Sequence, residues 1–267
     1  MNTKNIAILG CGNIGTAIAK GFIKANIKTN HIYITRRRIE FLKKIQSSKC
    51  IISDNKNAVL ESNIIIIAVG PSQIIDLLEE ISPHLNTKHL VISIVAGVSI
   101  SKIQTKINNN IPIIRAMPNT AASLCESMTC LTSNKNFNNE LQVAKELFEK
   151  LGTTLIIDEL QMASATALCA CGIAFFLRAI RAASQGGIEI GFHSDEAFTI
   201  ASQTARGAAT LLLDDSKHPE KEIDKVTTPM GATISGLNEM EHQGFSSAMI
   251  KGITVSTNKI TNLLNEK

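Results

Sequence analysis

The sequence predicts an α/β fold in which a parallel β-sheet with helices on its faces comes first and an all-helical part follows. Short apolar, β-branched runs alternate with segments of helical periodicity as far as Asp158. Beyond Asp158 the segments are Ala-rich and helical, and no strand signal of comparable quality appears. This change of pattern predicts two domains, at 1–160 and 161–267.

The composition is that of a soluble globular protein. Of the 267 residues, 44% are hydrophobic and 19% are charged. The net charge of +4 is mild, and no Trp and a single Tyr are available to stack on bases, so no nucleic-acid partner is predicted. The six cysteines show neither a CxxC pair nor zinc spacing, and the N-terminus shows no signal-peptide pattern. We therefore expect a cytoplasmic protein with reduced thiols and no metal.

The longest uncharged run, Met162–Leu177, is shorter than the roughly 20 residues that a membrane-spanning helix needs. It predicts a buried helix and no membrane partner.

The first strand, Ile6–Leu9, runs directly into Gly10-Cys11-Gly12-Asn13-Ile14-Gly15, and a helix follows. This strand–turn–helix order around G-x-G-x-x-G is typical of a dinucleotide-binding Rossmann domain. Gly10 permits the tight turn, Gly12 lets the backbone approach a pyrophosphate, and Gly15 lets the helix pack closely on the strand. The pyrophosphate would bind the free N–H groups of the helix start, at Asn13 and Ile14. The alternative is a glycine-rich turn without a ligand.

The second strand, His31–Thr35, is followed by Arg36-Arg37-Arg38. A site for NAD usually has a carboxylate about 20 residues beyond the glycines, to bind the ribose 2′-OH. Arginines stand there instead, and guanidinium groups match a phosphate well, so Arg36 and Arg37 favour the 2′-phosphate of NADP. The alternative is a solvated basic start to a helix over 39–47.

The other elements of the first domain follow in order. The run Ile64–Val69 is β-branched throughout, which is typical of a parallel strand covered on both faces. Ser72 and Ser99 are candidate N-caps of the helices that run through Ile81 and over Ile100–Ile107. The remaining predictions are strands at Cys50–Ile52, Leu90–Val95, Ile111–Arg115 and Thr153–Ile157, and a helix at Leu141–Leu151 with Gly152 at its C′ position.

Three strand ends are candidates for the lining of the cofactor site, because ligands of open α/β sheets bind at the carboxyl ends of the strands. They contribute Ala68, Val69, Gly70 and Pro71, then Ala96 and Gly97, and finally Asn119. Ordinary turn chemistry would explain the Gly and Pro residues equally well.

In the second domain, helices are predicted at Ser194–Leu213 and at Gly236–Leu264, with a break near Gly244. These helices are rich in Ala and Gly and too apolar for an isolated exposed bundle. Close packing between two copies would cover them, so we expect a homodimer.

The loop Val226–Thr233 is the candidate substrate site. Its small residues, Pro229 and Gly231 lead into a helix whose first N–H groups could bind a carboxylate, with a hydroxyl from Thr228 or Thr233. An N-capping Thr after a turn is the equally good alternative. No Ser/His/Asp or Cys/His nucleophile arrangement is present in the sequence, which favours a reaction that needs few protein acids and bases, such as reduction of an imine.

Taken together, these segments resemble the pyrroline-5-carboxylate reductase family along nearly the whole chain. The resemblance rests on the glycine turn, Ala68–Pro71, Ser93–Val98, Arg115–Thr120, Val226–Thr233 and Glu241–Phe245. It implies NAD(P)H-dependent reduction of 1-pyrroline-5-carboxylate to L-proline by a Rossmann domain followed by a helical dimerisation domain. It further implies dimers that assemble into a ring.

The resemblance also implies roles for individual residues. Met230, Gly231, Ala232 and Thr233 would hold the substrate carboxylate, with the Thr233 hydroxyl beside the ring nitrogen as the catalytic group. Asn55 would lie beside the adenosine ribose.

Three segments depart from the family pattern. Gly70 replaces a usual Lys, Met230 replaces a Gly, and Cys169–Ala174 replaces a Ser- and Pro-containing turn beside the substrate pocket. Two other functions therefore stay open: an imine or hydroxyacid dehydrogenase with another substrate, and an NADP-binding sensor without catalysis.

Overall fold

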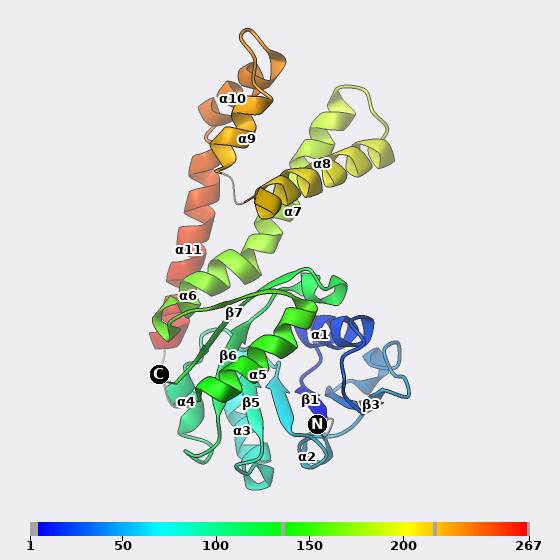
Figure 1. Cartoon of the computed structure of the whole chain (residues 1–267), viewed down its shortest axis with the longest axis vertical. Helices are drawn as coiled ribbons and strands as arrows, with labels where there is room; N and C mark the ends of the chain where they lie inside the picture. Colours follow the sequence, from blue (N-terminus) through cyan, green and yellow to red (C-terminus); the bar gives the residue numbers. More distant parts are fainter. Residues whose placement is uncertain (1–4, 135–136, 216–217, 266–267) are drawn as a thin grey trace. The chain divides into compact units, whose positions relative to one another are not determined.

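The computed structural model describes residues 5–134, 137–215 and 218–265. Its strands form one eight-stranded sheet in the order β3-β2-β1-β4-β5-β6-β7-β8, and Figure 1 labels several of them. All neighbouring strands pair in parallel except β6 and β7, which are antiparallel. The strands are β1 Ile6–Leu9, β2 Ile32–Thr35, β3 Cys50–Ile52, β4 Ile64–Ile67, β5 Leu90–Ser93, β6 Ile113–Met117, β7 Ser127–Ser133 and β8 Gly152–Ile156.

The chain divides into two compact units. The first comprises Met1–Cys171 together with Ser256–Lys267, and the second comprises Gly172–Val255. The domain limits expected from the sequence, 1–160 and 161–267, stay a prediction. Helices that begin in the first unit are α1 Asn13–Lys24, α2 Asn55–Leu60, α3 Ile74–Ile81, α4 Ile100–Gln104, α5 Asn138–Phe148 and α6 Met162–Ala165, with a π-helical segment at Thr166–Cys171.

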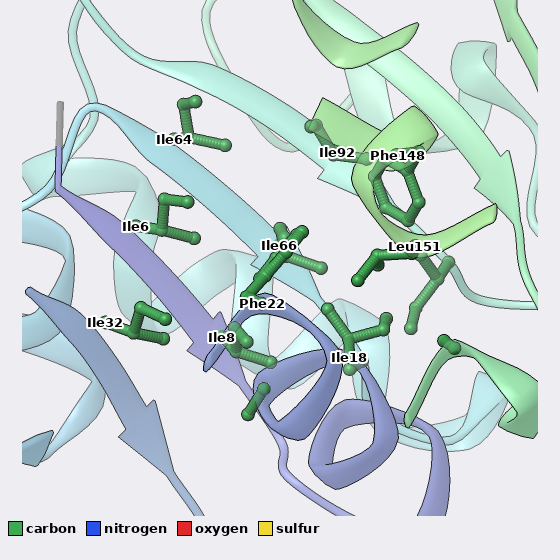
Figure 2. Packing of buried hydrophobic residues seen from close by; sticks show 14 of the residues in the cluster. Ile6, Ile8, Ile18, Phe22, Ile32, Ile64, Ile66, Ile92, Phe148 and Leu151 are labelled. Atoms are coloured by element: carbon green, nitrogen blue, oxygen red, sulfur yellow. The ribbon is translucent and has the colours of Figure 1, made fainter. Parts of the chain in front are cut away.

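Strands β1, β4, β5 and β6 are buried on both faces, because their side chains alternate between two apolar clusters. On one face, Ile64 and Ile66 pack with α1 and α5, where Phe22 and Phe148 meet edge to face with ring centroids 6.4 Å apart (Figure 2). On the other face, Ile65 and Ile67 pack with α2, α3 and α4. The uninterrupted isoleucine run of β4 is thus explained, as expected for a parallel strand covered on both sides.

In the first unit, one predicted helix did not form, and strand β7 and helix α2 were not predicted. No helix spans 39–47: only a short 3₁₀ turn forms at Ile39–Phe41, and Leu42 N–H donates to Ile39 O at 2.8 Å in the i→i−3 pattern. Strand β7 was missed because Ser127–Ser133 mixes hydroxyl and apolar residues without a continuous apolar run. It also pairs with β6 in the antiparallel direction, without a helical crossover.

The two predicted caps differ in outcome. The Ser99 hydroxyl accepts from Lys102 N–H at 3.1 Å, so its N-cap role is confirmed. Ser72 does not cap α3. Instead, the 3₁₀ turn Pro71–Gln73 precedes the helix, and the Gln73 side chain turns back to accept from Gly70 N–H at 3.1 Å. The strand end at Gly70 is thereby fixed to the start of α3.

The second unit contains helices only, among its described residues. They are α7 Gly172–Glu189, α8 Ser194–Asp215, α9 Pro219–Lys225, α10 Ala232–His242 and most of α11 Phe245–Asn265. Gly244, with φ +81°, separates α10 from α11 and confirms the predicted break. Helix α9 was not predicted.

The expectation that Met162–Leu177 is a buried helix was wrong for the single chain. Leu168, Phe176 and Leu177 are 54%, 61% and 59% exposed. In the described part of the chain, one helix, Glu159–Glu189, is long and apolar enough to cross a membrane by length and composition, and 28% of its most apolar window is buried. One such helix is weak evidence for a membrane span, and its exposed apolar residues equally suit contact with another protein chain.

The end of α11 returns to the first unit. Ile260 is buried, and a Cβ atom placed at Gly97 would lie 3.1 Å from Leu263 Cβ. Gly97 has φ +70°, so the loop after β5 uses glycine both for its left-handed backbone and for its closeness to this last helix.

Candidate functional site

A cavity of about 620 Å³ opens in the first unit at the carboxyl ends of the strands. Eight of the predicted cofactor-binding residues line it: Gly10, Gly12, Arg36, Arg37, Asn55, Ala68, Val69 and Gly70. Seven others, Asn13, Ile14, Gly15, Pro71, Ala96, Gly97 and Asn119, are not in its lining. The structure thus brings the glycine turn, the arginines and the β4 strand end together around one space.

The glycine turn has the geometry that a close ligand needs. Gly10 has φ +90°, and a Cβ there would lie 2.4 Å from Val69 Cγ1. Gly15 lies so near the strand that a Cβ would come 3.0 Å from Gly10 O. Around Gly12, in contrast, nothing lies within 4 Å of the Cβ position. The helix start beside this open space has no side-chain cap, so the first N–H groups of α1 are available to an anion.

A hydrogen-bond chain links the glycine turn to two helices. Gly10 N–H donates to Thr35 Oγ1 at 3.2 Å, and the Thr35 hydroxyl donates to Asn55 Oδ1 at 2.6 Å. Asn55 Nδ2 then donates to both carboxylate oxygens of Glu80, at 3.1 and 3.0 Å. Asn55, predicted to lie beside the adenosine ribose, is therefore held at the cavity wall from both sides.

Three arginines lie in the cavity wall. Arg36, Arg37 and Arg38 follow β2, and the Arg36 guanidinium lies over the Phe41 ring, with Cζ 4.5 Å from the centroid. Stacking of this kind holds a guanidinium in place, so that its N–H groups are available to a ligand.

Six other residues of the cavity lining were not among the predicted site residues: Ser53, Asp54, Gln73, Asp76, Leu77 and Glu80. The apolar spacing of α3 could have predicted part of this lining. Burial of Ile74, Leu78 and Ile81 leaves the polar positions of the helix on its outer face.

Asn119 has a structural role in addition to its predicted one. Its Oδ1 accepts from Ala121 N–H at 3.0 Å, and its Nδ2 donates to the Cys169 carbonyl oxygen at 3.1 Å. That carbonyl belongs to the π-helical segment Thr166–Cys171, and such wide turns are frequent at functional sites. Asn119 thus fixes the strand end of β6 to this segment.

The candidate substrate loop lies in the second unit. Pro229 and Met230 are the central residues of a turn in which Gly231 N–H donates to Thr228 O at 2.9 Å. Gly231 is the N-cap of α10, so the unpaired N–H groups of the helix start are those of Ala232, Thr233 and Ile234. Met230 has φ +59°, and its side chain is fully exposed. The roles predicted for Met230, Gly231, Ala232 and Thr233 stay predictions.

Comparison with known sequences identifies the family. A family model described as pyrroline-5-carboxylate reductase dimerisation matches residues 159–263, and one described as NADP oxidoreductase, coenzyme F420-dependent, matches residues 5–97. Pyrroline-5-carboxylate reductase 2 of Dictyostelium discoideum is 48% identical over 97% of this chain and 92% of that protein. The chain belongs to the pyrroline-5-carboxylate reductase family. Pyrroline-5-carboxylate reductase 1 of the same organism is 50% identical, and the chain spans half of its length.

Solved structures of pyrroline-5-carboxylate reductases share the fold. The structure from Plasmodium falciparum, with NADP bound, has a TM-score of 0.90 at 24% identity and covers 99% of both chains. The structure from Coxiella burnetii has a TM-score of 0.87 at 27% identity and covers 98% of this chain and 99% of its own. These matches confirm the predicted fold class, a Rossmann-like domain with a parallel sheet followed by a helical dimerisation domain.

Proposed function

We propose that the chain reduces 1-pyrroline-5-carboxylate to L-proline, with NADPH as the source of the hydride that C5 receives. The observation that carries this proposal is the 48% identity to a pyrroline-5-carboxylate reductase over nearly the whole of both chains. NADP(H) as cofactor is supported by the oxidoreductase model over residues 5–97 and by the NADP bound in the Plasmodium falciparum neighbour.

The residues of the cavity fit this cofactor. The open space at Gly12 admits a pyrophosphate beside the uncapped start of α1, where N–H groups and the helix dipole favour an anion. Arg36 and Arg37 supply cationic forks for a 2′-phosphate. When bound, NADPH supplies the hydride; the protein holds and orients it.

The loop before α10 would hold the substrate. The N–H groups at Ala232 and Thr233 bind the carboxylate, and Met230 and Gly231 shape the turn that presents them. The Thr233 hydroxyl accepts from the protonated ring nitrogen and so orients the imine. A hydroxyl is a weak acid, and the imine nitrogen can arrive already protonated, so the reaction requires no stronger acid from the protein.

The test is loss of NADPH absorbance when the purified full-length chain receives 1-pyrroline-5-carboxylate. We expect turnover, and we expect Thr233→Val to lower kcat/KM by about tenfold or more, because a hydrogen bond to a charged group contributes about 1.5–3 kcal/mol. Thr153→Val, on the exposed face of β8, is the matched control and should leave kcat/KM unchanged. Tight NADPH binding without turnover on any cyclic imine would overturn the proposal in favour of a sensor.

We also propose that the chain works in the cytoplasm as a homodimer that can assemble further into a ring. The match of residues 159–263 to a dimerisation family supports a homo-oligomer, and the exposed apolar residues of α7 and α8 suit such a contact.

A further inference from the structure

Two cysteine side chains that the proposed reaction does not use lie in contact within the first unit. The Sγ atoms of Cys130 and Cys169 are 3.6 Å apart. Cys130 lies on β7 and is 4% exposed, whereas Cys169 lies in the π-helical segment and is partly exposed. Since 39 residues separate them in the sequence, the tertiary fold brings these thiols together.

The two thiols differ in acidity as well as in access. The hydrogen bond between the two thiols lowers the pKa of Cys169 and raises the pKa of Cys130. Because the thiolate is the nucleophilic form of cysteine and Cys169 is also the more exposed of the two thiols, Cys169 is the reactive member of the pair.

Two other thiols are poor competitors. Cys11 and Cys50 are fully buried, and burial raises their pKa to about 12 and about 11. Burial also raises the pKa of Cys171, which is partly exposed. Cys11, Cys50 and Cys171 are therefore less reactive than Cys169, and Cys125 is the remaining partly exposed thiol.

The surroundings hold the two sulfurs in place. Cys130 packs with Met117 and Met162 in a small apolar cluster, against which Cys169 also packs. On its backbone side, the Cys169 carbonyl accepts from Asn119 Nδ2 at 3.1 Å. A disulfide S–S bond is about 2.05 Å long, so the sulfurs need to approach by only about 1.5 Å.

We propose that Cys169 and Cys130 form a reversible oxidation site, in which a hydroperoxide oxidises Cys169 and Cys130 resolves the product as a disulfide. The Cys169 thiolate attacks one peroxide oxygen, the O–O bond breaks, and hydroxide leaves and takes a proton to become water. Cys169 is then a sulfenic acid. The Cys130 sulfur attacks Cys169 Sγ, the S–O bond breaks, and the second water leaves with the Cys130 proton. Two thiols lose two electrons, and one hydrogen peroxide becomes two waters.

The experiment uses the full-length chain and hydrogen peroxide, followed by alkylation of the remaining thiols, proteolysis and mass spectrometry. We expect a peptide pair cross-linked through Cys130 and Cys169, two fewer alkylated thiols per chain, and recovery of both thiols with dithiothreitol. Cys171→Ser is the matched control, since it removes a partly exposed thiol two residues away and should give the same cross-link. Cys130→Ser should leave a sulfenic acid on Cys169 that dimedone traps.

Two results would overturn the proposal. One is a disulfide between Cys169 and Cys171 in place of the predicted pair. The other is oxidation of Cys125 while Cys130 and Cys169 remain alkylatable. Mapping in the unmodified sequence decides the question even if Cys130→Ser does not fold, and it does not depend on turnover, so it is independent of the proposed reaction.

Discussion

At the scale of single residues, Met230 holds a left-handed backbone conformation at the start of the candidate substrate loop's helix. The turn Thr228–Gly231 has Pro229 at its second position and a positive φ at its third, which is the geometry of a type II turn. Glycine is the usual residue there, because a left-handed backbone costs an L-residue roughly 1–2 kcal/mol. The side chain of Met230 is fully exposed, so no packing within the chain offsets this strain.

We therefore expect Met230→Gly to raise the free energy of unfolding by up to about 1 kcal/mol, since relief of strain exceeds the added backbone entropy of glycine. Urea unfolding followed by circular dichroism measures this change. The neighbouring substitution Gly231→Ala should have the opposite sign, because its Cβ would lie 2.6 Å from Thr228 Oγ1 and 2.8 Å from Thr228 O. Shifts of the same sign at the two positions would contradict this explanation.

In the proposed site Arg36 contacts the 2′-phosphate of NADPH, so its substitution tests the choice of cofactor. We expect Arg36→Ala to raise the Kd for NADPH by about tenfold or more and to change the Kd for NADH by less than about twofold, because only NADPH carries the 2′-phosphate. Fluorescence titration with both cofactors measures it. Lys43→Ala removes an exposed positive charge outside the cavity lining and should leave both Kd values unchanged. Equal losses for the two cofactors would show that Arg36 does not contact the phosphate.

At the scale of elements, α2 depends on one carboxylate in the cavity wall. Asp54 is its N-cap, and its two oxygens accept from the Asn57 backbone N–H at 2.8 Å and from Asn57 Nδ2 at 2.7 Å. These hydrogen bonds lower the pKa of Asp54 below its ordinary value of 3.8. The stabilisation is thus present above pH about 4 and is lost as the pH falls through the folded-state pKa.

We expect Asp54→Ala to lower the free energy of unfolding by about 1 kcal/mol at neutral pH, as for other N-caps. The difference from the unmodified chain should shrink steadily below pH about 4. Denaturant midpoints measured across this range test it. A difference that stays constant into acid would mean that the ionised carboxylate is not the stabilising form.

The elements also show what the sequence could predict. Strands that are runs of Ile and Val were found, because burial on both faces demands such runs. Strand β7 was missed because two of its buried residues, Thr129 and Thr132, are polar. Burial of polar side chains in a paired strand cannot be read from an apolar pattern. In the site, each glycine of the turn acts locally and could be predicted. The hydrogen bonds that link Thr35, Asn55 and Glu80 could not be predicted, because they join three elements and depend on how these elements pack.

At the scale of the whole molecule, the second unit has exposed apolar side chains that a second protein chain could bury. Phe176, Phe198 and Ile250 are 61%, 58% and 62% exposed. Residues of this kind are buried in obligate interfaces, which resemble a domain core divided between two chains.

We expect light scattering to give a dimer or a multiple of it at micromolar concentration. Phe198→Asp should shift the mass toward the monomer, because a buried charge without a partner destabilises the interface. Gln203→Asp, on an exposed position of the same helix, adds the same charge and should leave the mass unchanged. A fully monomeric unmodified chain with intact helical content would refute the dimer.

The return of α11 to the first unit bears on how the protein is made. Residues 1–171 are synthesised before the helical insert of residues 172–255, and the segment that covers Gly97 is synthesised after it. During translation the loop after β5 therefore stays uncovered until the helical insert of residues 172–255 and the end of α11 have been synthesised. A premature stop within α11 would leave the sheet intact and this loop exposed. The first unit begins to fold before the helical insert is made and is completed only after it.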